Sequence, residues 1–555
     1  MKLGKRLMLG SAAGLVVMSG AQAADLPVKA KAVEYVKVCS LYGAGFWYIP
    51  GTDTCIKLGG YLRADAAIAT NSDFGANVSG NNAQATPGQG RLGNYFTLRA
   101  REDLNIDTRT ATEYGVVRTY FDGVFSWTTG NYVGTNSTSG ATAYSGTLAA
   151  VPSPTGAVTT GNTIPFNNIT LAGSGGSVNG TDGNTSAGSL GVYYAYIQFA
   201  GFTMGKAVSQ FDTPWQNYPG NNFDGLVGGG GTVTGVAQFT YTAQFGNGVS
   251  LAVSAEDPTQ YYQAGNVNMS GISGLGVGQG AYGSNAIGGT RAPNFVGQLR
   301  VDQAWGLFQA NLASHDNHVA YYGANETTGH PDDKWGWAAQ VALSIKNIPT
   351  GPGDTINMQA VYTDGATRYN FQNLAGSAFT MFGGSTNGAY QSVGIANAPD
   401  TVFVNGSQQE SITTWGFRGG YTHNWDAFWN TSVYGAYAQA RFGNLAKSTI
   451  CSTAGFFSTS ASGIGATPAN NACNPDFAIA QAGIITRWTP VKNLTFSADL
   501  NWTHLDQNYS GNITPPVPTN SPAGAIIAPQ AKPSTVYQLK DQDSVVLLLR
   551  AQRNW

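Results

Sequence analysis

The sequence predicts an all-β protein, a transmembrane antiparallel β-barrel of about 16 strands. Three observations carry this prediction: hydrophobic alternation with a period of two, links that are alternately long and short, and an N-terminal export signal. Only 10% of the 555 residues are charged, whereas 12% are aromatic and 74 are Gly, which argues against both an ordinary cytosolic enzyme and a disordered chain. A net charge of -2 excludes a nucleic-acid binder, which needs a basic face.

The N-terminus has the features of an export signal. Lys2, Lys5 and Arg6 precede an apolar run at 7–17, and Ala21-Gln22-Ala23 is a small-x-small cleavage site. We therefore expect a signal peptide at 1–23, an N-terminal segment at 24–54 that leads into the barrel, and a barrel at 55–555 with long extracellular loops. Beyond the signal, no apolar run approaches the roughly 18 residues that a membrane-spanning helix needs.

Export makes disulfides possible for the four cysteines. Their spacing suggests two local pairs, Cys39 with Cys55 and Cys451 with Cys473. The sequence alone permits three connectivities, and four buried thiols are the alternative.

Strand alternation is clearest in three segments. From Cys55 onward the apolar parity runs from Ile56 to Ile68. Segment 96–107 alternates in the same way, except that Glu102 lies on the apolar parity and predicts a bulge. Segment 494–503 has no exception. Further strands are predicted at 113–123, 191–199, 202–209, 235–246, 248–257, 294–303, 306–314, 335–346, 354–363, 412–423, 428–440, 476–488 and 542–555.

The links between these strands alternate in length. Long links at 70–94, 124–190 and 210–234 are followed by short ones, which predicts an outer-membrane barrel with all long loops at one end. We expect the long links, most clearly 128–190 and 270–290, to be solvated loops. Aromatic residues flank the short links and predict a girdle at the headgroup level, with a general preference of aromatics for strand ends as the alternative. They are Phe199, Phe202, Phe245, Trp305, Trp425, Phe428, Trp429 and Trp488.

The charged parity of the strands predicts a water-filled lumen. An Arg or Lys facing the bilayer midplane costs about 2 to 4 kcal/mol, so these side chains must face inward. A barrel of about sixteen strands is wide enough to hold water. The first three strands supply one pore-lining basic wall: Lys57, Arg63, Arg99, Arg101 and Arg118.

The long link 210–234 predicts an acidic constriction loop folded into this lumen. It carries Asp212 and Asp224 among aromatic residues and a run of glycines, which is unusual for a solvated loop. An outward loop whose aromatic residues contact neighbouring molecules or lipopolysaccharide is the alternative. Because acidic and basic lumen residues nearly balance, we expect weak ion selectivity.

Three stretches of the chain resemble alphaproteobacterial porins of the rhizobial and Brucella type. They are VCSLYGAGFWYIPGTDTCIKLGGY at 38–61, AYIQFAGFTMGK at 195–206 and RAQRNW at 550–555. The resemblance implies a sixteen-stranded, homotrimeric general-diffusion porin whose third long loop folds inward and places Asp212 and Asp224 opposite the arginines. The chain departs from the family at its terminal Trp555, where Phe is usual, and in its longer links at 124–190 and 364–411.

These features predict a bacterial outer-membrane porin, a passive diffusion channel for small hydrophilic solutes and ions. One alternative is a substrate-selective channel, with Tyr61, Tyr120 and Trp215 as stacking faces for sugars. The other is a surface-exposed structural or adhesive barrel with a blocked lumen. We expect contacts with outer-membrane lipid and lipopolysaccharide and none with nucleic acid.

No enzyme, cofactor or metal site is predicted. His315, His318 and His330 share one region, but no thiol or carboxylate set completes a recognisable ligand spacing. His423 and His504 have no evident paired Ser.

Overall fold

The computed structural model describes residues 37–69, 96–128, 146–147, 151–152, 158–159, 163–164, 189–216, 218–220, 226–231, 234–259, 261–272, 277, 282–371, 378–386, 389–457, 473–513 and 536–555. The chain contains two compact units, Met1–Ile56 and Lys57–Trp555. The expected signal peptide at 1–23 lies outside the described residues. None of the helices in the described ranges has the length and apolar character of a membrane-spanning helix.

A short strand pair and a disulfide organise the described part of the first unit. η1 (Ser40–Tyr42) is followed by β1 (Trp47–Tyr48), which pairs antiparallel with the start of β2 (Thr54–Ala69). Cys39 and Cys55 are disulfide-bonded, with their Cα atoms 6.1 Å apart, and both are buried. This is one of the two local pairs that the spacing suggests.

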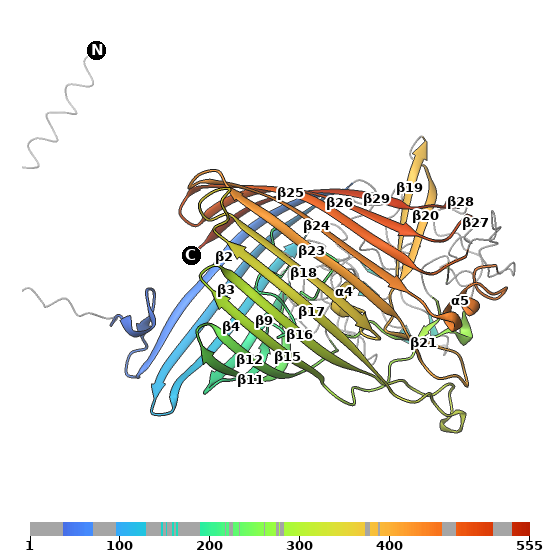
Figure 1. The fold of residues 1–555 in the computed structure, drawn as a ribbon, viewed down its shortest axis with the longest axis horizontal. Coiled ribbons are helices and arrows are strands. Elements are labelled where there is room, and N and C mark those ends of the chain that lie inside the picture. The colour runs from blue at the N-terminus through green and yellow to red at the C-terminus, as the bar shows by residue number, and fades with distance from the viewer. Residues whose placement is uncertain are drawn as a thin grey trace, which may run out of the picture. The chain divides into compact units, whose positions relative to one another are not determined.

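Sixteen strands in the described part of the chain form a closed antiparallel barrel (Figure 1). Each pairs with its neighbour in the chain, and the last pairs with the first from Tyr61 opposite Asn554 to Ala69 opposite Val546, which closes the wall. After β2 they are β3 (Phe96–Thr112), β4 (Gly115–Thr128), β9 (Ser189–Phe199), β10 (Phe202–Ala207), β11 (Val236–Gly246), β12 (Val249–Glu256), β15 (Asn294–Gln303), β16 (Gly306–Asn317), β17 (Lys334–Lys346), β18 (Thr355–Asp364), β23 (Thr413–Asn424), β24 (Trp429–Arg441), β25 (Phe477–Val491), β26 (Leu494–Gln507) and β29 (Gln542–Asn554). The predicted fold class is confirmed.

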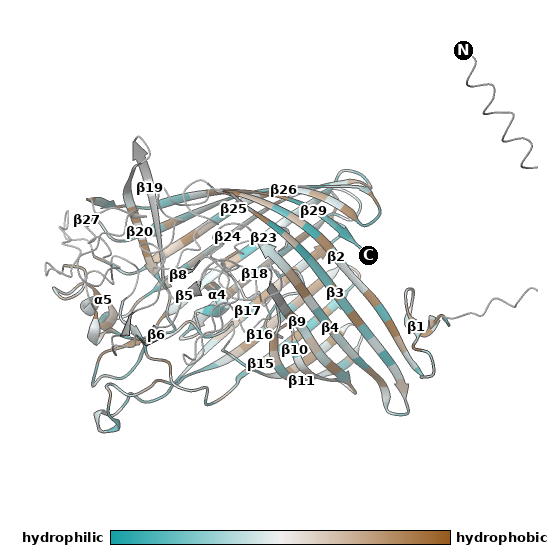
Figure 2. Cartoon of the chain, turned by 180° about the vertical axis from the view of Figure 1, so that it is seen from behind, coloured by the Kyte–Doolittle hydropathy of each residue, from teal (hydrophilic) through white to brown (hydrophobic). Residues whose placement is uncertain are grey.

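Side chains alternate between the outer and inner faces of this wall. The apolar Leu62, Leu98 and Phe125 are 57, 45 and 44% exposed, whereas Arg99 and Arg101 are 5 and 8% exposed. Because successive side chains of a strand point to opposite faces, the charged parity faces inward. Figure 2 shows the resulting alternation of hydrophobic and hydrophilic residues along β2, β3 and β4.

The bulge predicted at Glu102 is wrong. β3 and β4 pair without a register shift from Arg99 to Thr112, and Glu102 lies opposite Phe125 on the outward parity. A register shift occurs instead between Asp122 and Gly123, where β4 pairs with β9. The pairing of β3 is therefore kept, and a carboxylate is left on the outer face of the barrel.

Consecutive strands run in opposite directions, so successive links lie at opposite ends of the barrel. Because short and long links alternate along the chain, the short links between the described strands all lie at one end. The aromatic residues that flank them are exposed: Phe245 and Trp425 by 65% and Trp305 by 50%. Trp429 and Trp488 stack on the outer face with their ring centroids 5.6 Å apart. This arrangement agrees with the predicted aromatic girdle at the end that carries the short turns.

The long links carry further elements at the opposite end. One small sheet contains β13 (Asn266–Asn268), β14 (Ser284–Asn285), β21 (Thr401–Phe403) and β22 (Glu410–Ser411), and another contains β19 (Ala378–Thr386), β20 (Ala389–Asn397), β27 (Gly511–Ile513) and β28 (Tyr537–Leu539). The helical elements are η4 (Met269–Gly271), η5 (Glu326–Thr328), α4 (Arg368–Phe371) and α5 (Asn444–Ile450). Two-residue strands pair as β5 (Gly146–Thr147) with β8 (Thr163–Ile164) and β6 (Val151–Pro152) with β7 (Val158–Thr159).

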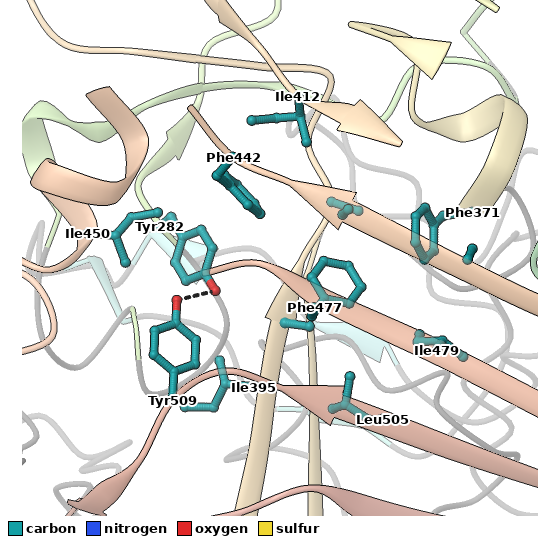
Figure 3. Close-up of a cluster of buried hydrophobic side chains, with 14 of the residues drawn as sticks. Tyr282, Phe371, Ile395, Ile412, Phe442, Ile450, Phe477, Ile479, Leu505 and Tyr509 are labelled. Carbon is teal, nitrogen blue, oxygen red and sulfur yellow. Dashed lines mark hydrogen bonds between the residues drawn. The ribbon is translucent and has the colours of Figure 1, made fainter. Parts of the chain in front are cut away.

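These links share a buried apolar cluster with the barrel wall. Phe477 of β25 packs in one cluster with Ile395, Tyr282 and Tyr509 from the links, and the two tyrosine hydroxyls are 2.6 Å apart (Figure 3). The expectation of a solvated loop at 270–290 is wrong for Val277 and Tyr282, which are fully buried, whereas Ser270, Gly271, Ser284 and Asn285 are exposed. The second disulfide, Cys451–Cys473, lies beside this cluster, and its pairing is the one that the spacing suggests.

Candidate functional site

The inner face of β29, β2, β3 and β4 forms a basic arc. Arg101 on this arc donates a 2.9 Å hydrogen bond from Nε to Ser126 Oγ on the next strand. Arg109 and Arg550 were missed by the sequence prediction, although both continue the inward parity of their strands. The basic residues of the arc are Arg63, Arg99, Arg101, Arg109, Arg118 and Arg550. Lys57 lies at the start of β2 with an exposed side chain, and its place in the pore lining stays a prediction.

Asp65 holds two guanidinium groups in place from a buried position. Its carboxylate is fully buried, with Arg99 Nη2 at 2.8 Å and Arg550 Nε at 2.6 Å. The neighbouring Arg63 donates from Nε to Gln552 Oε1 at 2.9 Å. Charge-assisted hydrogen bonds of this kind fix the orientation of a guanidinium as well as its position.

Asp107 also holds two guanidinium groups in place, closer to the end of the barrel with the short turns. Its carboxylate lies 2.9 Å from Arg109 Nη2 and 3.0 Å from Arg118 Nη2. The Arg118 guanidinium also lies over the rings of Tyr120 and Tyr196, at 5.1 and 5.7 Å from their centroids. Ion pairing and cation–π contact therefore hold Arg118 from two sides.

The structure does not bring the three predicted stacking residues together. The Tyr61 ring lies against Arg63 of the basic arc, with a centroid distance of 4.3 Å, and Tyr120 lies on the same arc. Trp215 instead donates from Nε1 to Gln359 Oε1 of β18, at 3.1 Å. No continuous track of these three rings results.

The inner segment, the described residues of 209–231 (209–216, 218–220 and 226–231), packs against the inward side chains of a covered arc. This arc comprises β15, β16, β17, β18, β23, β24 and β25. The amide groups of inward Gln and Asn residues donate hydrogen bonds of 2.6 to 2.9 Å to successive backbone carbonyls of the segment. The donors are Gln298, Gln309, Asn311 and Gln340, and the acceptors are Gln210, Phe211 and Asp212. Inward amides on neighbouring strands were a signal that the sequence prediction did not use.

Arg418 of β23 holds the glycine-rich part of the segment. Its guanidinium donates to the carbonyls of Leu226, at 3.0 Å, and of Gly230. Gly228 has a φ of +86°, and a Cβ there would overlap the carbonyl of Phe417. The glycine run therefore lets the backbone lie directly on the barrel wall, where a side chain has no room.

Asp212 lies on the covered side of the lumen. It is 4% exposed and accepts a 3.0 Å hydrogen bond from the Tyr262 hydroxyl. Burial, with the nearby carboxylate, raises the pKa of Tyr262 well above its ordinary value, so the hydroxyl keeps the proton that it donates. The structure thus places the Asp212 carboxylate beside Tyr262. Its position opposite the arginines of β2, β3 and β4 stays a prediction. Asp224 lies outside the described residues.

The histidines that could suggest a metal site have separate partners. His315 contacts Asn294, at 2.9 Å, and His318 contacts Asp333, at 2.7 Å. In the described ranges no group of three or more His, Cys, Asp or Glu side chains is arranged to hold a metal ion.

Comparison with known proteins places this barrel in a family. The family described as "Porin subfamily" matches residues 25–548. Porin Omp2b of Brucella neotomae is 29% identical over 65% of this chain and 84% of its own length, and Porin Omp2b of Brucella canis is 30% identical over 58% and 68%. The crystal structure of the outer membrane channel DcaP of Acinetobacter baumannii has the same fold, with a TM-score of 0.50 and 15% identity over 92% of this chain and 99% of that one. The chain belongs to the porin subfamily and is a non-enzymatic diffusion channel of the bacterial outer membrane.

Proposed function

We propose that this porin is a passive, water-filled channel for small hydrophilic solutes, narrowed where the inner segment lies opposite the basic arc. The observation that carries the proposal is the anchoring of residues 209–231 to the inward side chains of the covered arc. A segment held there takes up cross-section on one side of the lumen and leaves the basic arc as the other boundary of the path. Asp224, which belongs to the same link, remains a candidate for an acidic group at this narrowing.

Single-channel recording across a planar bilayer tests this function directly. We expect stepwise insertion of the folded protein, a current linear in salt concentration, and no block by a particular sugar. Silent bilayers from a heat-modifiable, folded barrel would contradict a diffusion pore and would favour a function in the long links, which pack into the cluster of Figure 3. Saturable block by one sugar class would support a substrate-selective channel instead.

We further propose that the channel is a homotrimer that buries the barrel seam. An outer groove of about 720 Å³ crosses β3, β2, β29 and β26 and is lined by small side chains. Among these are Ala64, Ala66, Ala100 and Ala551, with aromatic side chains at the rim. Small residues permit close approach of two walls. Glu102, next to this groove on the outward parity of β3, is better accommodated against protein than against lipid.

A bulky side chain in the groove tests this interface. Ala66→Trp is expected to convert the trimer to monomers in detergent, as measured by light scattering. Ala310→Trp is the matched control, because Ala310 lines a second outer groove of similar volume on β15, β16, β17 and β18. Loss of the trimer in both variants, or in neither variant, would contradict the assignment of the seam.

Elsewhere the outward apolar side chains are expected to contact outer-membrane lipid and, at the end with the long links, lipopolysaccharide.

A further inference from the structure

The basic arc carries more positive than negative groups. Along the described strands β29, β2, β3 and β4, six basic residues face inward: Arg63, Arg99, Arg101, Arg109, Arg118 and Arg550. Four carboxylates share this face: Asp65, Asp103, Asp107 and Asp122. A near balance of charge, which the sequence suggested for the whole lumen, therefore does not hold for this part of the wall.

The acidic and basic side chains of the basic arc also differ in how exposed they are. All four carboxylates are less than 9% exposed. In the pairs around Asp107, the side chains of Arg109 and Arg118 are 29 and 27% exposed, against 11% for the carboxylate between them. At Asp65 the carboxylate is fully buried, whereas Arg550 keeps 10% exposure. Around Asp107 the guanidinium groups are thus more exposed than the carboxylate that anchors them, whereas Arg99 and Arg101, 5 and 8% exposed, are as buried as the carboxylates.

The arginines of the covered arc are oriented differently. The Arg418 guanidinium is buried against carbonyls of the inner segment, and Arg487 donates to the carbonyl of Pro219. Those positive charges hold backbone in place, and the segment lies over them. Other inward charges of the covered arc, Arg300, Asp302 and Lys346, stay 33 to 45% exposed at the end of the barrel with the short turns, and they carry one net positive charge.

We propose that this porin selects for anions, and that its preferred solutes are small hydrophilic anions that bear carboxylate or phosphate groups. The inference rests on the proposed open channel. A wall of fixed guanidinium groups raises the local concentration of anions over about one Debye length, roughly 8 Å at physiological ionic strength. Guanidinium also matches the planar geometry of carboxylate and phosphate oxygens.

The test is the reversal potential of single channels in a tenfold KCl gradient. We expect a chloride-to-potassium permeability ratio of about three or more near 0.1 M salt, falling toward one near 1 M, where the Debye length is about 3 Å. This salt dependence is measured on the unaltered protein and needs no variant. Sodium phosphate, added as a probe, should reduce the chloride current more than the same concentration of glucose does.

A double variant locates the effect. Arg109→Gln with Arg118→Gln leaves Asp107 without these two guanidinium groups and should lower the permeability ratio at least twofold. Arg441→Gln is the control, because Arg441 lies on the outward parity of β24 and its substitution removes one positive charge away from the lumen. The effect of the double variant is therefore compared per charge removed. Heat-modifiable migration on a gel verifies folding of each variant.

The outcomes separate this inference from the proposed function. No conductance from the folded protein would overturn the diffusion channel itself. Conductance with a permeability ratio of one or below would overturn anion selectivity and leave the channel standing. An anion preference that Arg441→Gln reduces as much as the double variant would overturn the role of the basic arc.

Discussion

The basic arc and the covered arc use arginine in opposite ways. On the basic arc, arginines pair with buried carboxylates from neighbouring strands, as Asp65 pairs with Arg99 and Arg550. On the covered arc, Arg418 donates to backbone carbonyls of a segment that is not part of the wall. Around Asp107, carboxylate pairing leaves the Arg109 and Arg118 side chains 29 and 27% exposed, whereas the carbonyl partners of Arg418 leave that residue 3% exposed beneath the inner segment. Exposed positive charge on the inner face therefore lies at Asp107 and not at Arg418.

The largest expected effect on the current comes from removing Arg418. Arg418→Ala leaves the carbonyls of Leu226 and Gly230 without their charged donor, which costs about 2 to 4 kcal/mol of unfolding free energy. We expect the inner segment to loosen, with single-channel conductance increased by about half or more and with added current noise. Bilayer recording and limited proteolysis within 209–231 measure the two effects.

A second variant keeps the charge and tests the same contact. Gly228→Ala places a Cβ against the Phe417 carbonyl at a positive φ, so it should displace the segment in the same direction. Arg441→Ala on the outer face of β24 is the control for loss of a guanidinium. Unchanged conductance and protease resistance in both Arg418→Ala and Gly228→Ala would show that the covered arc does not set the width of the channel.

A smaller effect is expected from Asp107→Asn on the basic arc. The substitution removes a buried negative charge behind Arg109 and Arg118, so the chloride-to-potassium permeability ratio should rise about twofold. Loss of the charge-assisted hydrogen bonds should lower the unfolding free energy by about 1 to 3 kcal/mol. Reversal potentials and denaturant unfolding in detergent measure these quantities.

Asp302→Asn is the control for this substitution. Asp302 is also inward, but its side chain is 42% exposed beside Arg300 and Lys346 at the end of β15. An exposed pair of this kind contributes about 0 to 1 kcal/mol. A permeability ratio that stays constant in Asp107→Asn would mean that the anchored guanidinium groups do not border the ion path.

Most of the barrel could be predicted from the sequence because its alternation has a single cause. Adjacent residues such as Leu62 and Arg63 point to opposite faces of the barrel wall, one toward the outside and one toward the lumen. The alternation of apolar and polar residues therefore persists along nearly every strand. Glu102 broke the pattern and was interpreted as a bulge, yet the pairing of β3 with β4 continues through it. One charged residue costs less than breaking a ladder of hydrogen bonds, especially where a protein neighbour can cover it.

The positions of the inner segment and of the long links were harder to predict. That Asp212 meets Tyr262 depends on contacts between residues 50 positions apart, which no local pattern encodes. Burial of Tyr282 against Tyr509 spans 227 positions. The inward parity of Gln340 and Gln359 was visible in the sequence. That Gln340 donates to the segment and Gln359 accepts from it depends on the three-dimensional register of the strands.

Substitution of Asp354, a carboxylate outside both arcs, should lower the free energy of unfolding and leave the single-channel current unchanged. Asp354 ends the link between β17 and β18, where it accepts hydrogen bonds from Thr350 Oγ1, at 2.7 Å, and from the backbone N–H of Asn424, at 2.8 Å. His423 and Tyr421 also contact it, at 2.7 and 3.1 Å. Removal from water raises the pKa of this carboxyl, but the hydrogen bonds outweigh that effect and hold the pKa below its ordinary value.

The sign of the pH dependence follows from this lowered pKa. Asp354 stabilises the native state while it is ionised, and this contribution is lost only as the pH falls from the unfolded pKa of 3.8 through the lower native pKa. Asp354→Asn should therefore reduce the unfolding free energy by the same amount at pH 7 and at pH 5, because the carboxyl is ionised at both. The difference from the unaltered protein should shrink below about pH 4. Conductance and reversal potential should stay unchanged, and a shift in either would mean that the turn, and not only the two arcs, shapes the ion path.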